Sequence, residues 1–210
     1  MFNVSSEDYF VIFTSGATGA LKLLADSFFK SRDNSLNTVK EIKRNKANDS
    51  VNFSVCTCKG AADENISKLV CFTEDNHTSA VGVVRQSMSS NTTCVCLKNS
   101  TVCELENLSE NTDSLEPFCI CSEAACSSDP DVKRLFLYPL QSNFNGRRYP
   151  QQWVELAQSG KLLCGSNWFV AVDAASFVAT SPLDLSHTPA DFIALSFYKI
   201  FGFPTGLGTT

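Results

Sequence analysis

The sequence has only two histidines, His77 and His187, and no long run of basic residues. Its formal net charge of -5 at pH 7 argues against a nucleic-acid-binding protein, which needs a positive surface. No apolar stretch is long enough to cross a bilayer, because Asp173 and Lys199 interrupt the most hydrophobic regions. The opening residues MFNVSSEDYF contain neither a basic segment nor a long apolar core, so we expect no signal peptide. These absences predict a cytoplasmic protein without a membrane or nucleic-acid partner.

Cysteine is abundant, with ten residues, but its placement does not indicate a disulfide scaffold. Eight of the ten lie in the segments 33–67 and 86–130, and without a secretion signal we expect free thiols. A zinc site would need better-spaced pairs and a supporting histidine, so we predict no metal site. The Cys-x-Cys pairs are Cys56/Cys58, Cys94/Cys96 and Cys119/Cys121.

The hydrophobic pattern predicts the fold class. Hydrophobic residues make up 43% of the chain, which is enough for a substantial buried core. Short runs rich in β-branched and aromatic residues predict strands, of which the first, at 9–15, is expected to be buried. Helical patterns run from Gly16 to Phe29 and begin again near Pro150. Strands buried on both faces and separated by helices predict an α/β fold with a mainly parallel sheet flanked by helices. The other predicted strands lie at 69–72, 132–139, 168–176 and 192–197.

Two segments interrupt this pattern. Residues 33–67 are rich in Asn, Ser and Lys, and residues 86–130 are rich in Ser, Thr, Asn and Cys. The second segment has one lysine, Lys98, against seven acidic residues. Because such compositions bury little apolar surface, we predict that both segments are surface loops inserted into the domain.

Three features could carry chemistry, and each has an ordinary structural alternative. The turn Gly16-Ala17-Thr18, between a strand and a helix, offers backbone N–H groups to an anion, although small residues in such a turn often serve packing alone. Asp173 follows an apolar strand, where a carboxylate either caps a turn or holds a ligand cation. Lys199 lies in an aromatic run, where burial would lower its pKa and free the amine for a Schiff base, unless the side chain reaches to solvent. In this order on an α/β framework, the three features favour pyridoxal 5'-phosphate as the cofactor.

Four longer stretches carry a resemblance to a known family. They read EDYFVIFTSGATGALKLLADSF, FTEDNHTSAVGV, LFLYPLQSNFNGRRYP and VDAASFVATSPLDLSHTPADFIALSFYKIFGFPTGLG. The sequence resembles the class V, fold-type I pyridoxal-phosphate enzymes, which include the cysteine desulfurases. Within them it most closely resembles the amino-terminal domain of the molybdenum cofactor sulfurase family. The resemblance implies that residues 1–210 form an incomplete fold-type I large domain, with loop insertions at 33–67 and 86–130.

The resemblance also implies a role for seven residues. Lys199 would link covalently to the cofactor, and Asp173 would pair with its pyridine nitrogen. His77, in DNHTS, would stack on the ring and assist proton transfer, unless it is an ordinary loop histidine. Asn143, in QSNFNG, would hydrogen-bond the ring hydroxyl oxygen, unless it is only a turn residue. The phosphate would be held by Ala17, Thr18 and Ser196.

Two positions depart from the cysteine desulfurases. Ser176 stands where those enzymes usually have glutamine, and Tyr198 where they have histidine. Both residues are compatible with the molybdenum cofactor sulfurase family and argue against a simple iron–sulfur desulfurase. The implied reaction is abstraction of sulfur from L-cysteine, with alanine as the other product and molybdenum cofactor as the final acceptor. Fold-type I enzymes usually build their sites at a dimer interface, so a homodimer is also expected.

The resemblance leaves parts of the family pattern without a match. None of the ten cysteines matches the family's attacking cysteine, and its substrate-binding arginine and molybdenum-cofactor-binding domain would follow Thr210. We therefore expect the chain to be a fragment that is inactive alone. Two alternatives stay open: another class V enzyme, such as a cysteine desulfurase or lyase, and a truncated product that binds a partner without catalysis.

Overall fold

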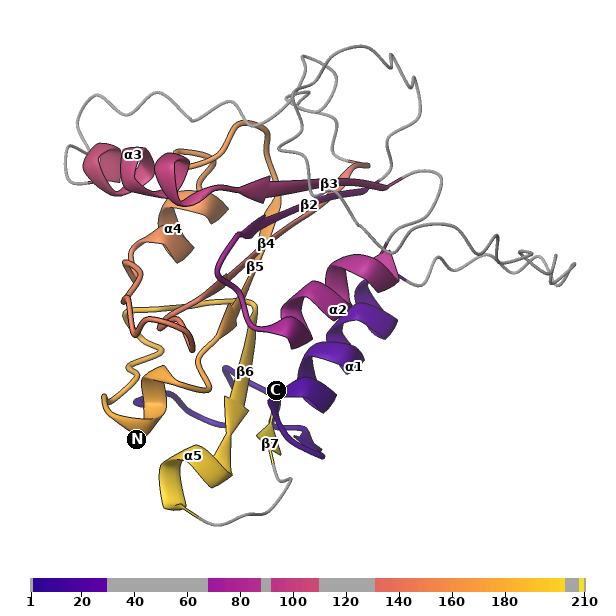
Figure 1. The fold of residues 1–210 in the computed structure, drawn as a ribbon. Helices are drawn as coiled ribbons and strands as arrows, with labels where there is room; N and C mark the ends of the chain where they lie inside the picture. The colour runs from indigo at the N-terminus through magenta and orange to yellow at the C-terminus, as the bar shows by residue number, and fades with distance from the viewer. Residues whose placement is uncertain (1, 30–67, 88–91, 110–130, 203–207, 210) are drawn as a thin grey trace, which may run out of the picture.

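A seven-stranded sheet forms the centre of the molecule. The computed structural model describes residues 2–29, 68–87, 92–109, 131–202 and 208–209 (Figure 1). The strand order is β1-β7-β6-β5-β4-β2-β3, with parallel pairing from β6 through β3 and antiparallel pairing of β7 with both β1 and β6. The strands are β1 (Phe13–Thr14), β2 (Lys68–Thr73), β3 (Thr92–Leu97), β4 (Lys133–Pro139), β5 (Trp168–Asp173), β6 (Phe192–Ser196) and β7 (Gly208–Thr209).

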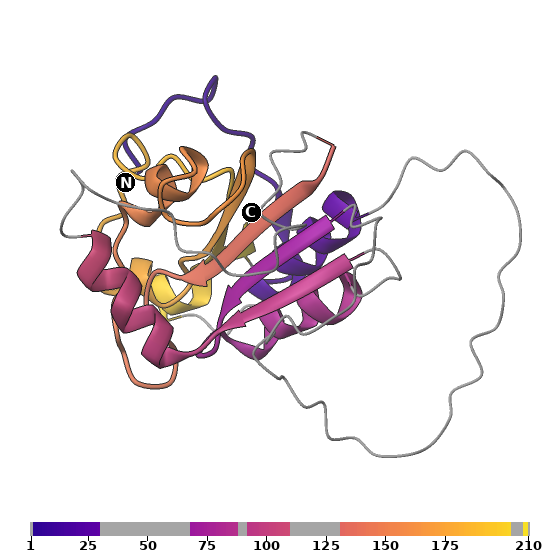
Figure 2. The same cartoon turned by 90° about the horizontal axis from the view of Figure 1, so that it is seen from above.

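Helices cover both faces of this sheet. α1 (Ala17–Phe29) and α2 (Thr78–Ser87) pack side by side on one face, while α3 (Asn99–Ser109) and α4 (Trp153–Gln158) cover the other (Figures 1 and 2). A 3-10 turn, η2 (Phe177–Ala179), follows β5, and the short helix α5 (Phe197–Phe201) follows β6.

The period-2 alternation of strand side chains explains this double cover. In β4, Leu135 and Leu137 face the core beneath α1 and α2, whereas Phe136 and Tyr138 face the core beneath α3 and α4. All four side chains are fully buried, as expected for a strand with helices on both sides. The predicted α/β fold with a mainly parallel, helix-flanked sheet is confirmed.

The prediction of a buried strand at 9–15 is wrong. Only Phe13–Thr14 form a strand, which pairs with β7 at the margin of the sheet. Phe10 is 94% exposed, and Val11 and Ile12 are exposed as well. An apolar run favours burial, but it becomes buried only where another layer covers it, and the described residues supply no such layer here.

The prediction of a loop over 86–130 is also wrong in part. Within it, β3 pairs in parallel with β2, and Val102 and Leu105 of α3 are buried in the core. The Ser- and Asn-rich composition of the segment obscured this structure. Val95 and Leu97 are buried because alternate side chains of the strand face the core, although the segment as a whole is polar. The predicted insertion at 33–67 and the residues 110–130 and 203–207 lie outside the described residues.

The described cysteines and helices bear on two further expectations. The five described cysteines, Cys71, Cys94, Cys96, Cys103 and Cys164, are free thiols. The Cys56/Cys58 and Cys119/Cys121 pairs lie outside the described residues. None of the helices within the described ranges combines the length and apolar character needed to cross a membrane.

Truncating a central core residue should destabilise the protein strongly. Leu135→Ala removes a fully buried side chain between the sheet and α1, and we expect it to lower the free energy of unfolding by about 2–5 kcal/mol. The control Phe10→Ala changes an exposed apolar side chain and should alter stability by less than about 0.5 kcal/mol. Chemical denaturation of both variants measures this, and equal losses would contradict the assigned burial.

Candidate active site

The seven residues singled out by the sequence come together at one edge of the sheet. The carboxyl ends of β2, β4, β5 and β6 lead into the segments that carry them, and the first turn of α1 lies at the same edge. A cavity of about 120 Å³ lies there, where side chains at the ends of parallel strands meet. Its lining includes Ala17, Thr18, His77, Asn143, Asp173, Ser196 and Lys199.

The turn before α1 forms one wall of this cavity. Gly16 has a φ of 105°, a left-handed conformation that glycine adopts readily, and its carbonyl accepts a hydrogen bond from Thr14 Oγ1 at 2.9 Å. The first N–H groups of α1 have no acceptor within the helix, so they are available to an anion. Ser196, at the end of β6, adds a hydroxyl to the lining. Its Oγ is buried and has no hydrogen-bond partner among the described residues, so it is free to bind a ligand.

Asp173 supplies a buried carboxylate at the end of β5. The residue is 3% exposed, and its Oδ1 accepts the backbone N–H of Ala175 at 3.0 Å. Burial raises the pKa of this carboxyl, against the lowering effects of the Ala175 hydrogen bond and the charges of Lys199 and His77. A positively charged ligand group placed here would favour the ionised carboxylate.

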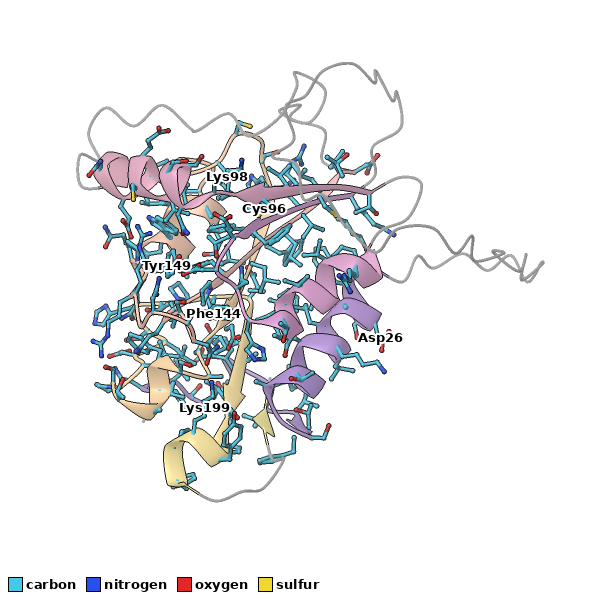
Figure 3. All side chains as sticks on the ribbon, in the orientation of Figure 1. Asp26, Cys96, Lys98, Phe144, Tyr149 and Lys199 are labelled. Carbon is cyan, nitrogen blue, oxygen red and sulfur yellow. The ribbon has the colours of Figure 1, made fainter. Side chains whose placement is uncertain are left out.

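Lys199 lies on α5 and reaches back toward the loop after β4. Figure 3 shows Lys199 beside the lower end of β6, with Phe144 of that loop above it. Lys199 Nζ donates to Asn143 Oδ1 at 2.5 Å and to Ser176 Oγ at 3.0 Å, and Ser176 Oγ donates to the same Asn143 oxygen. Partial burial lowers the pKa of Lys199, and Asp173 opposes this effect by raising it. Neutral acceptors thus hold the amine in place, and its partial burial makes the uncharged, nucleophilic form easier to reach than in a free lysine.

His77 belongs to a hydrogen-bonded chain that also lines the cavity. Its Nδ1 accepts the backbone N–H of Ser79 at 3.2 Å and lies 2.8 Å from Ser79 Oγ. Since Nδ1 accepts a backbone proton, the neutral ring carries its own proton on Nε2. Ser79 Oγ lies 2.6 Å from Thr18 Oγ1, so this serine joins the His77 turn to the first turn of α1.

Sequence reasoning missed Ser79. Its position two residues after His77 suits a local turn, but nothing in the sequence indicates that it meets Thr18. Taken together, the cavity joins the N-terminal turn of α1, a buried carboxylate and a lysine whose pKa is lowered by partial burial. Such a set can hold one ligand that carries an anionic group, a cationic group and a carbonyl group, and the lysine can transfer a proton beside it.

Known proteins resemble this chain over its whole length. It is 38% identical to the molybdenum cofactor sulfurase of Homo sapiens, an alignment that covers 99% of this chain and 19% of that protein. It is 38% identical to the molybdenum cofactor sulfurase of Danio rerio and 35% identical to that of Bombyx mori, again over 99% of this chain. The chain is homologous to molybdenum cofactor sulfurases. The resemblance read from the four sequence stretches is confirmed.

The homology concerns only a part of each sulfurase. The alignments cover 19% of the human, 21% of the Danio rerio and 22% of the Bombyx mori protein, so the chain spans about a fifth of its relatives' length. No family model matches the chain.

Solved structures show the same fold. The cysteine desulfurase CsdA from Escherichia coli superposes with a TM-score of 0.55 at 17% identity, covering 95% of this chain and 37% of that one. A chain of the complex between SepCysS and the N-terminal domain of SepCysE matches with a TM-score of 0.50 at 11% identity, covering 95% of this chain and 40% of that one. This sulfurase-related chain therefore has a fold shared with a cysteine desulfurase, as the fold-type I resemblance predicted.

Neutralising Asp173 should stabilise the ligand-free protein. Folding raises the pKa of this carboxyl above its value of about 3.9 in the unfolded chain. At a pH above about 3.9, ionisation of Asp173 therefore lowers the stability of the folded state, and at lower pH this cost vanishes. Asp173→Asn keeps the acceptor for Ala175, so we expect a gain of about 1 kcal/mol at pH 7 that disappears near pH 3.

Asp184→Asn is the matched control. The pKa of this exposed carboxyl is lowered, mainly by a hydrogen bond from Ser186, so its replacement should bring no gain at pH 7. Thermal unfolding of both variants at the two pH values measures the effect. A loss of stability in Asp173→Asn at pH 7 would contradict the assigned cost of the buried charge.

Proposed function

We propose that this chain forms the cofactor-binding part of a pyridoxal-phosphate-dependent enzyme that abstracts sulfur from L-cysteine for the sulfuration of molybdenum cofactor. The observation that carries the proposal is the meeting of Lys199, Asp173 and Ser196 around one cavity, where the Ser196 hydroxyl has no partner among the described residues. Homology to the sulfurases and the fold of a cysteine desulfurase support it.

The residues present fit pyridoxal phosphate. Ser196 Oγ is buried with no partner in the part of the chain that the structure describes, and it offers a hydrogen bond that a phosphate oxygen would accept. The N–H groups at the start of α1, including that of Ala17, and the Thr18 hydroxyl offer further donors to the same anion. Asp173 would hold the protonated pyridine nitrogen, a cation whose charge would favour the ionised form of this buried carboxylate. Asn143 would contact the ring hydroxyl oxygen.

Lys199 would hold the cofactor covalently and later carry a proton. When bound, pyridoxal phosphate supplies an electron sink for negative charge that develops on the substrate. The substrate amine would displace Lys199, and the released amine at Nζ would take up and return a proton. Its hydrogen bonds to Asn143 Oδ1 and Ser176 Oγ would keep it within reach of the reacting atoms.

His77 would lie against the ring and act through Nε2. The Ser79 hydrogen bonds to Nδ1 fix the ring orientation and leave Nε2 as the nitrogen that carries the proton of the neutral ring. This arrangement suits a general acid or base beside the substrate. A thiolate would bond to the cysteine sulfur as the carbon–sulfur bond breaks, which would give a persulfide. The substrate carbon would keep the electron pair of that bond and take up a proton, which would give alanine.

The complete activity requires more than this chain. None of the cysteines in the chain matches the family's attacking cysteine, so the thiolate and the site that binds molybdenum cofactor are proposed to lie elsewhere in a longer polypeptide. On this view the 210-residue chain is inactive alone. The cytoplasmic location and the homodimer stay predictions.

Lys199→Ala tests the proposal. In protein made from the complete coding sequence, we expect loss of the visible absorbance of bound pyridoxal phosphate and a fall in cysteine desulfuration of roughly 10²–10⁴-fold. Ser196→Ala should keep the covalent link but weaken cofactor retention, because it removes one buried phosphate donor. The control Lys161→Ala changes an exposed lysine outside the cavity and should leave both readouts unchanged.

Reduction with borohydride followed by peptide mass spectrometry locates the attachment. A pyridoxyl group on Lys199 is the expected result. Attachment to another lysine, or none in the unsubstituted protein, would contradict the proposal.

The rate at which the protein binds the cofactor covalently should depend on pH, because it depends on the protonation of Lys199. Only the neutral amine attacks the cofactor aldehyde, and burial lowers the pKa of Lys199, so capture should rise at a lower pH than for free lysine, whose pKa is about 10.4. Asp173→Asn removes the group that opposes this lowering and should move the rise to still lower pH. Absorbance kinetics on cofactor-stripped protein measure this. A midpoint at or above that of free lysine would contradict the assigned environment.

A further inference from the structure

A buried hydrogen bond joins the two loops that carry His77 and Asn143. The turn between β2 and α2 contains Asp75, Asn76 and His77, while the loop between β4 and α4 contains Asn143 and Tyr149. Tyr149 OH donates to Asp75 Oδ1, and both residues are buried, at 3% and 9% exposure. Neither residue lines the cavity, but each lies on a loop that does.

Each loop is otherwise anchored to its own surroundings. Asn76 Nδ2 donates to the carbonyl oxygens of Thr73 at 3.0 Å and Leu137 at 3.1 Å, which ties the first turn to β2 and β4. In the second loop, Tyr149 N donates to Leu140 O at 3.0 Å. The Tyr149 hydroxyl thus extends from a fixed backbone position to the residue two before His77.

The surroundings keep Tyr149 as a neutral donor with a fixed ring. Burial and the Asp75 hydrogen bond raise the pKa of the Tyr149 hydroxyl, so it stays protonated at physiological pH. The Arg147 guanidinium lies over the ring, 5.3 Å from its centroid, and pairs with Glu106 of α3. The other carboxyl oxygen, Asp75 Oδ2, is buried without a hydrogen-bond partner among the described residues. The Tyr149 donor is therefore difficult to replace.

We propose that Asp75 and Tyr149 are positioning residues of the site. Their hydrogen bond holds the two loops together, so that His77 and Asn143 both face the cofactor cavity. The inference rests on the proposed function, because it concerns how that site is held. Without the hydroxyl, the Asp75 carboxyl would turn toward water or another donor and displace the adjoining residues. His77 and Asn143 would then sample more than one arrangement around the cavity.

Tyr149→Phe is the test, with Tyr138→Phe as its matched control. Both changes keep a buried aromatic ring and remove one hydroxyl hydrogen bond. The Tyr138 hydroxyl, however, donates to Pro150 O at 3.3 Å, whereas the Tyr149 hydroxyl donates to Asp75. The variants are made in protein expressed from the complete coding sequence and loaded with pyridoxal phosphate.

The two variants should differ in cofactor readouts rather than in stability alone. For Tyr149→Phe we expect roughly tenfold weaker retention of pyridoxal phosphate, a reduced visible circular dichroism of the bound cofactor, and a fall in kcat of roughly tenfold with little change in KM. Tyr138→Phe should lower the melting temperature of cofactor-free protein to a similar degree but leave these three readouts near those of the unsubstituted protein.

Changes at Asp75 separate the hydrogen bond from the charge. Asp75→Asn keeps an oxygen acceptor for Tyr149 and should retain the cofactor nearly as well as the unsubstituted protein. Asp75→Ala should resemble Tyr149→Phe, and the double variant should be little worse than either single one, because both remove the same interaction.

The outcomes distinguish the two proposals. If the unsubstituted protein binds no pyridoxal phosphate, the proposed function fails. If it binds the cofactor but Tyr149→Phe matches Tyr138→Phe in retention, circular dichroism and kcat, the proposed function stands and the positioning role is overturned. Additive losses in the Asp75→Ala, Tyr149→Phe double variant would also overturn it.

Discussion

The site depends on the parallel pairing of β5 with β4 and β6. Asp173 lies opposite Pro139 on one side and Ala194 on the other, so three strands end at nearly the same level. Two backbone hydrogen bonds continue the alignment beyond the strands, from Leu140 N to Asp173 O and from Ala174 N to Ala194 O. The loop of Asn143, the Asp173 carboxylate and the α5 lysine therefore emerge together. A one-residue shift in either pairing would reverse the side-chain directions and turn Asp173 to the other face.

The same alignment exposes Asp173 and Lys199 to two competing effects, which are desolvation and mutual attraction. Burial disfavours the charge on each, while each charge favours the other, and desolvation is the larger effect for both. The pair thus differs from a surface ion pair, whose charges remain fully hydrated. A ligand that supplies a cation to Asp173 and an electrophile to Lys199 relieves both costs. This is a physical reason for the site to be less stable empty than occupied.

The sequence allowed prediction of the strands in the centre and of the residues at their ends. Apolar runs predicted β2, β4, β5 and β6 because these strands are covered on both faces, and Asp173 and Lys199 interrupt such runs. β1 was mispredicted because hydrophobicity does not reveal whether a covering layer exists. Ser79 was missed because its partner Thr18 lies 61 residues away, and Tyr149 and Asp75 were missed because they are separated by 74 residues. Pairings at such separations arise from topology, which a single sequence does not display.

The segment predicted as an insertion turns out to support the site from outside. β3 pairs with β2 just before the His77 turn, and Glu74 N donates to Leu97 O at the end of that pairing. α3 then supplies Glu106, which pairs with the Arg147 guanidinium that lies over the Tyr149 ring. Tyr149 in turn contacts Asp75, two residues before His77. Residues 92–109 are thereby linked to the cavity through two independent routes, one along the backbone and one through side chains. A segment with this position acts as part of the supporting layer of the domain, although its composition resembles that of a surface loop.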